Sequence, residues 1–293
     1  MPLPFDFATL TEDDLHDVGL GVTSKVVRIA NTDVVAKVPK PTAIFGLEVY
    51  KIEKKIYERL QEHPNILRYL GQSAPDCKPL RGALLFEYHP RGTVKDCLDQ
   101  LKVGPSRSRW PYQAASALAH LHSLRVVHGD FGLHNFLLRD DGSIVLFDFA
   151  GSGVDGGRSH VANETRYTNP HSTREHITEQ DDVFALGTVL YELDRGQLLF
   201  DGMSHEEIRK RLRDRQLPDL SMVALPLRDV IEKCWKVPEY KASDALKDLQ
   251  SQPAARTLRA FLQAVIGLGI VAFAVLMWKT PATVDLPKPS PEG

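Results

Sequence analysis

Three polar residues stand at a spacing that suits phosphate chemistry. Asp130 and Asn135 lie within the segment His128–Asn135, and Asp148 follows a short apolar run further along the chain. Two carboxylates and an amide that converge at one place can hold a divalent cation, a phosphate and a hydroxyl nucleophile. In the alternative interpretation these residues belong to two unrelated turns, in which the aspartates are ordinary caps.

Short strands are predicted on both sides of these polar residues. Apolar runs occupy residues 124–127, 136–138 and 144–147, and a polar turn separates the last two runs. Strand, polar loop, strand, turn and strand, in that order, would bring the three polar side chains to the mouth of one cleft. We therefore predict that this part of the chain binds a phosphate and a metal ion.

A lysine in a strand and a glutamate on a helix form a second candidate pair. Lys37 lies in the apolar run 34–38, and residues 47–61 have the apolar spacing of a helix. Glu53 borders the apolar side of that helix, and a carboxylate that faces the interior needs a cation nearby. We expect Glu53 to pair with Lys37. Glu48 is the alternative partner, and the simpler interpretation leaves Glu53 exposed and Lys37 at a sheet edge.

Two glycines precede Lys37 in a β-rich run. Gly19 and Gly21 stand two residues apart, and Asn31–Asp33 predicts the turn of a hairpin that follows them. Glycine lets backbone N–H groups approach phosphate oxygens without a Cβ in the way. Ser24 stands where a G-x-G-x-x-G pattern would have its third glycine, so this pattern is incomplete.

Composition limits the classes of protein to which the chain can belong. Its 293 residues suffice for one large or two modest domains, and a net charge of -2 does not indicate binding to nucleic acid. Cys77, Cys97 and Cys234 lie far apart, which argues against a disulfide framework and for a reducing compartment. The N-terminus lacks the basic and apolar regions of a signal peptide.

The chain divides into a polar lead-in at 1–15, a β-rich part at 16–89 and a helical part at 90–252. Strands are predicted at 67–71 and 82–88, and a proline and a glycine directly after the second strand mark the border between the two parts. Helices are predicted at 93–101, 110–123 and 180–193, from Ser204 onward, at 227–235 and at 242–249, with a glycine-rich loop at 151–169.

The C-terminal segment 260–278 has a different composition. It contains no charged residue, and its nineteen residues, at about 1.5 Å each, would span roughly 28 Å, close to the thickness of a hydrocarbon core. Two arginines precede it, and a proline-rich polar tail follows at 279–293. We predict a single-pass, tail-anchored membrane helix with the domain 16–252 on the cytoplasmic side. A buried or partner-binding helix is the alternative.

Together these segments resemble the eukaryotic protein kinase superfamily over residues 19–249. The motifs that carry the resemblance are Gly19-x-Gly21, Val35-Ala36-Lys37, Glu53 before His63-Pro64-Asn65, Phe86-Glu87-Tyr88, His128-x-Asp130-x4-Asn135, Asp148-Phe149, Asp182–Gly187 and Cys234-Trp235. In style the chain is similar to the divergent, short kinase-like proteins of fungi. The resemblance implies an α+β fold of two lobes, with a small β-rich N-lobe that holds one main helix and a larger α-helical C-lobe, followed by the C-terminal transmembrane helix.

The resemblance also implies a role for each site residue. Lys37 would hold the α- and β-phosphates of ATP, and Glu53 would orient Lys37. Asp148 and Asn135 would bind Mg²⁺, and Asp130 would accept the proton of a protein substrate's hydroxyl. The remaining residues of the implied ATP pocket are Gly19, Gly21, Val26, Ala36, Phe86, Glu87, His89 and Leu137.

Some positions depart from the family pattern. Gly129 and Gly132 replace an arginine and a lysine of the catalytic loop, and Ala150 replaces a glycine. Losing one positive charge near the γ-phosphate typically costs about 10² to 10³ in rate. Asn169-Pro170-His171 stands for A-P-E, and Lys241 stands for the arginine that pairs with its glutamate, which would loosen the substrate-binding segment.

Three functions remain open. The first is a membrane-anchored protein kinase that uses ATP and Mg²⁺. The second is a pseudokinase, an interaction module that binds nucleotide with little or no transfer. The third is a small-molecule phosphotransferase, a class that shares the pattern His-Gly-Asp-x4-Asn. The complete set of polar groups favours activity, and the helix at 180–193 with Cys234-Trp235 favours a protein kinase.

Overall fold

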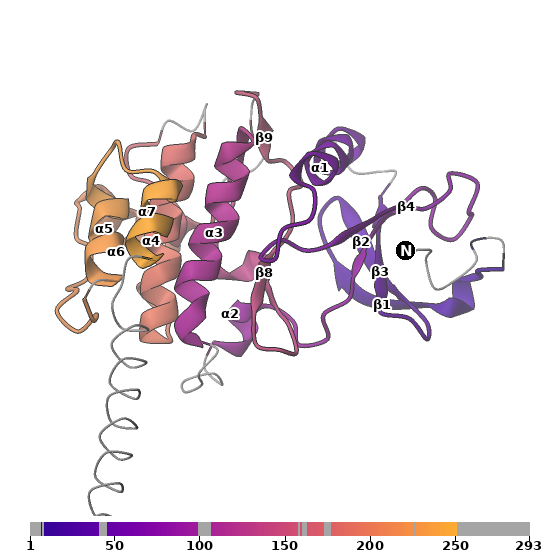
Figure 1. Ribbon diagram of the computed structural model, residues 1–293, viewed down its shortest axis with the longest axis horizontal. Helices are drawn as coiled ribbons and strands as arrows, with labels where there is room; N and C mark the ends of the chain where they lie inside the picture. The colour runs from indigo at the N-terminus through magenta and orange to yellow at the C-terminus, as the bar shows by residue number, and fades with distance from the viewer. Residues whose placement is uncertain are drawn as a thin grey trace, which may run out of the picture. The chain divides into compact units, whose positions relative to one another are not determined.

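The computed structural model describes residues 7, 9–40, 46–98, 107–157, 159, 163–172, 177–225 and 227–250. The chain separates into the units Met1–Gln250 and Ser251–Gly293, and all described residues belong to the first. Figure 1 shows this first unit as two lobes, with β1–β4 and α1 in one lobe and α3–α7 in the other.

The N-lobe is built on a five-stranded antiparallel sheet with the order β1-β2-β3-β5-β4. Its strands are β1 (Leu15–Leu20), β2 (Ser24–Ile29), β3 (Val34–Pro39), β4 (Tyr69–Gln72) and β5 (Leu84–Glu87). In β3 the first residues are buried on both faces because a separate apolar cluster, which includes Val27, Ile29 and Ala36, packs on the side away from the C-lobe. Strand β3, which carries Lys37, lies between β2 and β5 and is hydrogen-bonded to both.

Helix α1 (Gly46–Leu60) packs its apolar side toward the lobe interior. Val49, Ile56 and Leu60 are buried at the spacing that places residues on one side of a helix, as predicted. Glu53 lies among them and is only 2% exposed. The helix therefore carries a carboxylate into the interior, where it requires a cationic partner.

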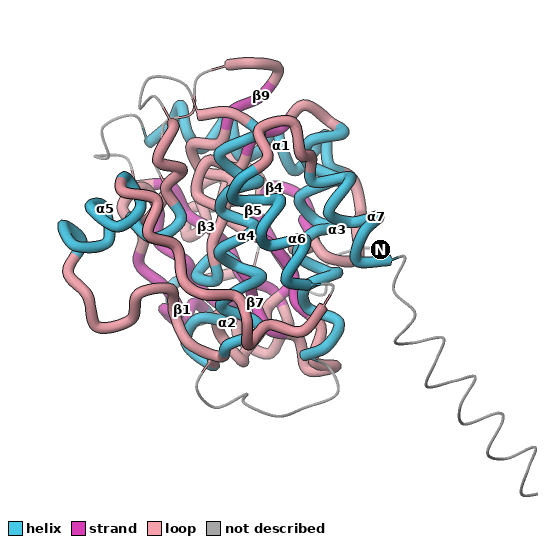
Figure 2. The backbone as a smooth tube through the Cα atoms, turned by 90° about the vertical axis from the view of Figure 1, so that its left-hand side faces the viewer, coloured by secondary structure: helices cyan, strands magenta, loops and turns pink. Residues whose placement is uncertain are grey.

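The C-lobe is mostly helical. Its helices are α2 (Val94–Cys97), α3 (Trp110–Ser123), α4 (Glu179–Arg195), α5 (His205–Arg213), α6 (Leu227–Lys236) and α7 (Ala242–Gln250). Helix α4 lies at the centre, with thirteen buried residues, and packs against both α3 and α6. Figure 2, seen from this lobe, shows α4 and α6 in front of the strands.

Two short two-stranded sheets lie at the border between the lobes and position the polar residues singled out above. Strand β7 (Phe136–Leu138) pairs with β8 (Ile144–Leu146), and β6 (Val126–Val127) pairs with β9 (Gly153–Val154). The segment His128–Asn135 connects β6 to β7, and Asp148 follows β8. The predicted order of strand, loop, strand, turn and strand is thus confirmed.

The predicted elements agree with the structure except at a few places. The β-rich run around Gly19 was not predicted to contain a separate first strand, but β1 begins at Leu15 after a 3₁₀ helix, Glu12–Asp14. Strand β9 lies inside the segment 151–169, which was expected to be loop throughout. Within the described ranges, no helix is both long and apolar enough to cross a membrane. The predicted membrane helix at 260–278 lies outside the described residues.

Candidate active site

A cavity of about 480 Å³ lies between the two lobes. Strands β1 to β3 form one wall, the connector from Glu87 to Gly92 closes the back, and the segment around Asp148 forms the floor. The predicted site residues that line it are Gly19, Gly21, Val26, Lys37, Glu53, Phe86, Glu87, His89, Leu137 and Asp148. Residues far apart in the sequence are thus brought together in one cleft.

Lys37 lies between two carboxylates at the inner end of this cavity. Its Nζ atom is 2.8 Å from each oxygen of Glu53 and 2.8 Å from Oδ1 of Asp148. The predicted pair of Lys37 and Glu53 is therefore present, and Glu48 is not needed as its partner. An ammonium ion held by two carboxylates keeps a fixed position, which a group that binds phosphate oxygens requires.

Burial and charge act in opposite directions on these three groups. Burial by itself would lower the pKa of Lys37, but the charges of Asp148 and Glu53 raise it, so the ammonium stays protonated. Burial raises the pKa of Glu53 to about 6 even though Lys37 lowers it. For Asp148, burial would raise the pKa, yet Lys37 brings it below the usual value. Lys37 and Asp148 are therefore fully charged near neutral pH.

A series of aromatic ring contacts, mostly edge to face, connects α1 with the loop that carries Asp130. The ring of Tyr57 lies 4.8 Å from that of Phe149, and Phe149 lies 5.4 Å from His128. Tyr57 also stacks on Tyr69 of β4 at 5.7 Å. Because Phe149 follows Asp148 directly, these ring contacts hold the helix of Glu53 and the segment of Asp148 in one fixed arrangement.

Asp130 and Asn135 face each other across their loop. The Asn135 amide Nδ2 donates to the Asp130 backbone oxygen at 2.7 Å and to its Oδ2 at 3.2 Å. This use of the amide nitrogen leaves the amide oxygen of Asn135 for a cation. Burial would raise the pKa of Asp130, but the hydrogen bond and charge of His134 lower it, so the carboxylate is ionised and able to accept a proton.

The donor set fits a magnesium ion that also binds phosphate. Mg²⁺ prefers oxygen ligands and usually takes one or two from the protein and the rest from water and phosphates. Asp148 has a side chain that is 42% exposed toward the cavity, although one of its oxygens contacts Lys37. Asp148 and Asn135 would hold such an ion, which would supply charge neutralisation at the phosphates.

The prediction that Ala36 lines the adenine pocket is wrong. Ala36 is fully buried in the apolar cluster on the other side of the sheet, and Val35 lines the cavity in its place. Side chains along a strand point alternately to opposite faces, so Lys37 shares its face with Val35 and not with Ala36. Val35 and Val26 of the N-lobe and Leu137 of the C-lobe are thus among the apolar residues that line the cavity.

Asp182 at the start of α4 fixes the loop of Asp130, a role that the sequence did not reveal. Its carboxylate accepts the backbone N–H groups of His128 at 2.7 Å and of Gly129 at 2.9 Å, and His122 contacts it at 3.0 Å. Gly129 has φ of 79°, a left-handed conformation that glycine adopts without strain. The backbone conformation at position 129 thus favours glycine over the arginine of the family pattern.

The turn after Asp148 tolerates Ala150. The left-handed residues of this turn are Asp148, with φ of 64°, and Gly151, with φ of 93°. Ala150 does not require a positive φ, so its methyl group introduces no backbone strain. The replacement of the family's glycine is therefore compensated by the glycine one residue later.

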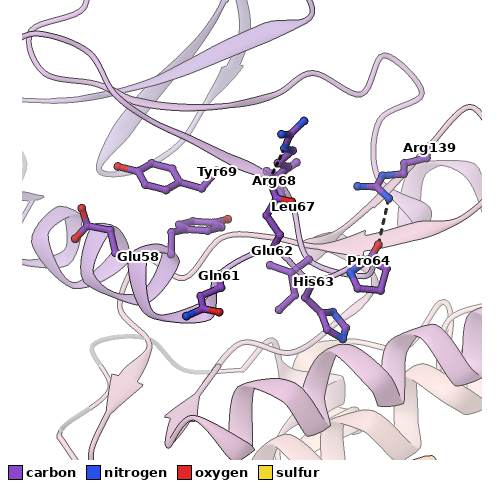
Figure 3. A pocket seen from close by; sticks show the side chains of 11 residues that line it. Glu58, Gln61, Glu62, His63, Pro64, Leu67, Arg68, Tyr69 and Arg139 are labelled. Atoms are coloured by element: carbon purple, nitrogen blue, oxygen red, sulfur yellow. Dashed lines mark hydrogen bonds and ion pairs between the residues drawn. The ribbon is translucent and has the colours of Figure 1, made fainter. Parts of the chain in front are cut away.

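A second hollow of about 640 Å³ lies outside the cleft, beside the C-terminal end of α1 (Figure 3). Its walls come from α1, the loop that leads to β4, and Arg139, whose Nη1 donates to the Pro64 backbone oxygen at 3.1 Å. None of the predicted catalytic or metal-binding residues lines it. Volume alone therefore does not identify the site, and the convergence of Lys37, Glu53 and Asp148 does.

Comparison with known proteins agrees with this geometry. The protein kinase domain model matches residues 13–253, and the chain therefore belongs to the protein kinase family. The chain is 32% identical over 195 residues to "Aurora kinase" of Schizosaccharomyces pombe, which covers 62% of this chain and 54% of that protein.

Two plant proteins are similar to the same degree. "Probable serine/threonine-protein kinase PBL18" of Arabidopsis thaliana is 31% identical over 169 residues, which is 54% of this chain and 43% of the relative. "Probable receptor-like protein kinase At4g10390" of the same plant is 31% identical over 219 residues, which is 67% of this chain and 63% of the relative. The matches thus span about half the length of these curated relatives.

Proposed function

We propose that the chain is an ATP- and Mg²⁺-dependent protein kinase that transfers the γ-phosphate to a hydroxyl group of a protein. The observation that carries this proposal is the position of Lys37, 2.8 Å from both Glu53 and Asp148. Phosphate transfer by kinases needs this lysine–glutamate pair and the metal-binding aspartate in place together. Because relatives carry serine/threonine kinase in their names, we expect serine and threonine as acceptors ahead of tyrosine.

Each group has one task in the proposed transfer. Lys37 binds the α- and β-phosphates, while Asp148 and Asn135 hold Mg²⁺. Asp130 accepts the proton of the acceptor hydroxyl as the oxygen forms a bond to the γ-phosphorus. The bond between the γ-phosphorus and the bridging β-oxygen breaks, and ADP leaves with its electron pair.

Incubation of the full-length chain with Mg²⁺, γ-labelled ATP and a mixed set of proteins tests this function. We expect label to enter protein, with phosphoserine or phosphothreonine as the product. We expect EDTA to abolish the transfer because, without Mg²⁺, the carboxylate of Asp148 would face the like-charged phosphates with no cation between them. The Asp148→Asn variant, purified in the same way, controls for contaminating kinases. Equal labelling by this variant would contradict the proposal.

The same preparation distinguishes an active kinase from a pseudokinase. A Mg²⁺–ATP complex present at 100 times its dissociation constant should raise the free energy of unfolding by about 2.7 kcal/mol. A thermal shift with ATP but no label in any protein would favour an interaction module over an enzyme. Label in small hydroxylated molecules, with none in protein, would favour the small-molecule phosphotransferase.

We also propose that residues 260–278 anchor the chain in a membrane. The support is their uncharged composition and a length close to that of a hydrocarbon core. After extraction of membranes with alkaline carbonate, the full-length chain should stay in the pellet, and a variant that ends at residue 259 should appear in the supernatant. Release of both into the supernatant would refute the anchor.

A further inference from the structure

The ring of His134 lies across the loop at the position of Gly132. Its Nε2 atom is 3.1 Å from Oδ2 of Asp130, and its Nδ1 atom is 3.5 Å from Oε2 of Glu164. The imidazole thus stands between the loop that carries Asp130 and the segment 163–172. Its side chain is 24% exposed, so most of the ring is enclosed by these two segments.

Only glycine at position 132 leaves room for this ring. A Cβ atom added there would lie 2.6 Å from Cε1 of His134 and 2.8 Å from Cε2 of Tyr167. Gly132 has φ of -165°, an extended conformation that every residue can adopt. Space, and not backbone conformation, therefore requires the glycine.

Tyr167 cannot move aside to make that room. It is fully buried, its hydroxyl donates to Glu192 at 2.7 Å, and the hydroxyl oxygen accepts the backbone N–H of Leu133 at 3.3 Å. A side chain at position 132 would therefore displace His134, the more exposed of the two rings. Gly132 and His134 depend on each other.

The two carboxylate oxygens of Asp130 have different partners. Oδ2 accepts from His134 Nε2 and from Asn135 Nδ2, at 3.1 and 3.2 Å. Oδ1 accepts the backbone N–H of Glu164, at 3.3 Å. One oxygen is thus held by two side chains, and the other has a single long hydrogen bond that an acceptor hydroxyl can replace.

Glu164 extends this contact to the substrate side of the cleft. Its carboxylate also accepts from Lys95 of α2 at 3.1 Å and from Arg166 at 3.2 Å. Through His134, the loop of Asp130 is therefore connected to a segment that two cations already hold in place. This arrangement limits the rotation of the Asp130 carboxylate.

We propose that His134 is a positioning residue that orients the Asp130 carboxylate toward the acceptor hydroxyl, and that Gly132 is glycine so that His134 can reach it. This inference rests on the proposed kinase function. In this chain the imidazole occupies the space beside Asp130 that a side chain at position 132 would otherwise fill. Misplacement of a reacting group by about 1 Å can cost on the order of 10²-fold in rate.

Four variants of the full-length chain test the proposal in the transfer assay at saturating Mg²⁺–ATP. We expect His134→Ala and Gly132→Ala each to lower kcat by about 10- to 100-fold, with the KM for ATP changed by less than about twofold. His134→Gln, whose amide can donate to Asp130, should recover part of the lost rate. His134→Phe, which keeps a ring without a donor, should be as slow as His134→Ala. An exposed histidine on β1 provides the matched control, His16→Ala, which should keep the wild-type rate.

The double variant separates the proposal from a general loss of structure. Once His134→Ala has removed the ring, a Cβ at position 132 still meets Tyr167 but no longer displaces a partner of Asp130, so Gly132→Ala should lower kcat by much less than it does in the wild-type chain. The melting temperatures of the four proteins of this cycle should show the same non-additivity. Effects of the two substitutions that multiply, or an equal rate for His134→Phe and His134→Gln, would overturn the inference. Full activity of the single variants would overturn this inference but not the proposed kinase function. Absence of transfer by the wild type would overturn both.

Discussion

Replacement of Asp130 by asparagine is expected to lower kcat for phosphate transfer by about 10² to 10⁴, the range that a general base contributes. Asparagine keeps the shape of the side chain and an oxygen that can accept from His134, but its amide cannot take up the proton of the acceptor hydroxyl. Asp130 does not line the ATP cavity, so nucleotide affinity should change by less than about twofold. Rate and affinity are measured by label transfer and by thermal shift with Mg²⁺–ATP.

The matched control is an aspartate outside the cleft. Asp140 is exposed in the turn between β7 and β8, and Asp140→Asn should keep the wild-type rate. If Asp130→Asn transferred phosphate at more than about one tenth of the wild-type rate, Asp130 would not be the base. If the variant lost nucleotide binding as well, the change would have disturbed the cleft, and the rate would say nothing about proton transfer.

The second large effect is expected for Lys37→Met. The variant leaves Glu53, which is 2% exposed, and Asp148 without their shared cation, and removal of one partner of a buried ion pair costs about 3 to 5 kcal/mol. Because the side chain of Asp148 is partly exposed, the lower end of this range applies. Nucleotide affinity and transfer should both fall, since the only changed side chain is the one that faces the phosphates.

The destabilisation by Lys37→Met should depend on pH in a stated direction. Burial holds the pKa of Glu53 at about 6 even with Lys37 present, and removal of the ammonium raises it further. A carboxyl whose pKa is raised on folding contributes stability at low pH that is lost as pH rises through the folded-state value. The difference in melting temperature between wild type and variant should therefore be small near pH 5 and grow toward pH 8.

A double variant separates stability from chemistry. Lys37→Met with Glu53→Gln removes the buried negative charge and should recover part of the stability at pH 8, while transfer stays as low as in Lys37→Met alone. Recovery of transfer would show that Lys37 affects the transfer rate only by stabilising the fold. A destabilisation that is independent of pH would show that the pKa of Glu53 is the same with and without Lys37.

The sequence predicted the main elements because their signals are local. The apolar spacing of 47–61 predicted α1, and the alanine-rich segment 110–123 coincides with α3. Glu53 was placed correctly because an acid next to an apolar stripe must find a cation, and Lys37 was available. β1 was missed since five of its six residues are exposed, which removes the alternation on which strand prediction depends.

Contacts between distant segments were decided by the tertiary structure alone. Ala36 was assigned to the ATP pocket because of a motif, whereas the pleat of β3 turns Val35 toward the cavity. No local pattern shows that Asp182 binds the loop of Asp130, because the two segments meet only when α4 packs against α3.

Asp130, Asn135 and Asp148, as a candidate set, follow from the sequence by itself, because a polar loop between short apolar runs fixes their order along the chain. The same sequence presented Gly132 as a missing charge. The tertiary structure explains this glycine, because the room for the His134 ring depends on Tyr167, a residue thirty-five positions away that is held by Glu192. Spacing along a chain specifies which groups can do chemistry, while the space left between packed side chains decides which of them reach one another.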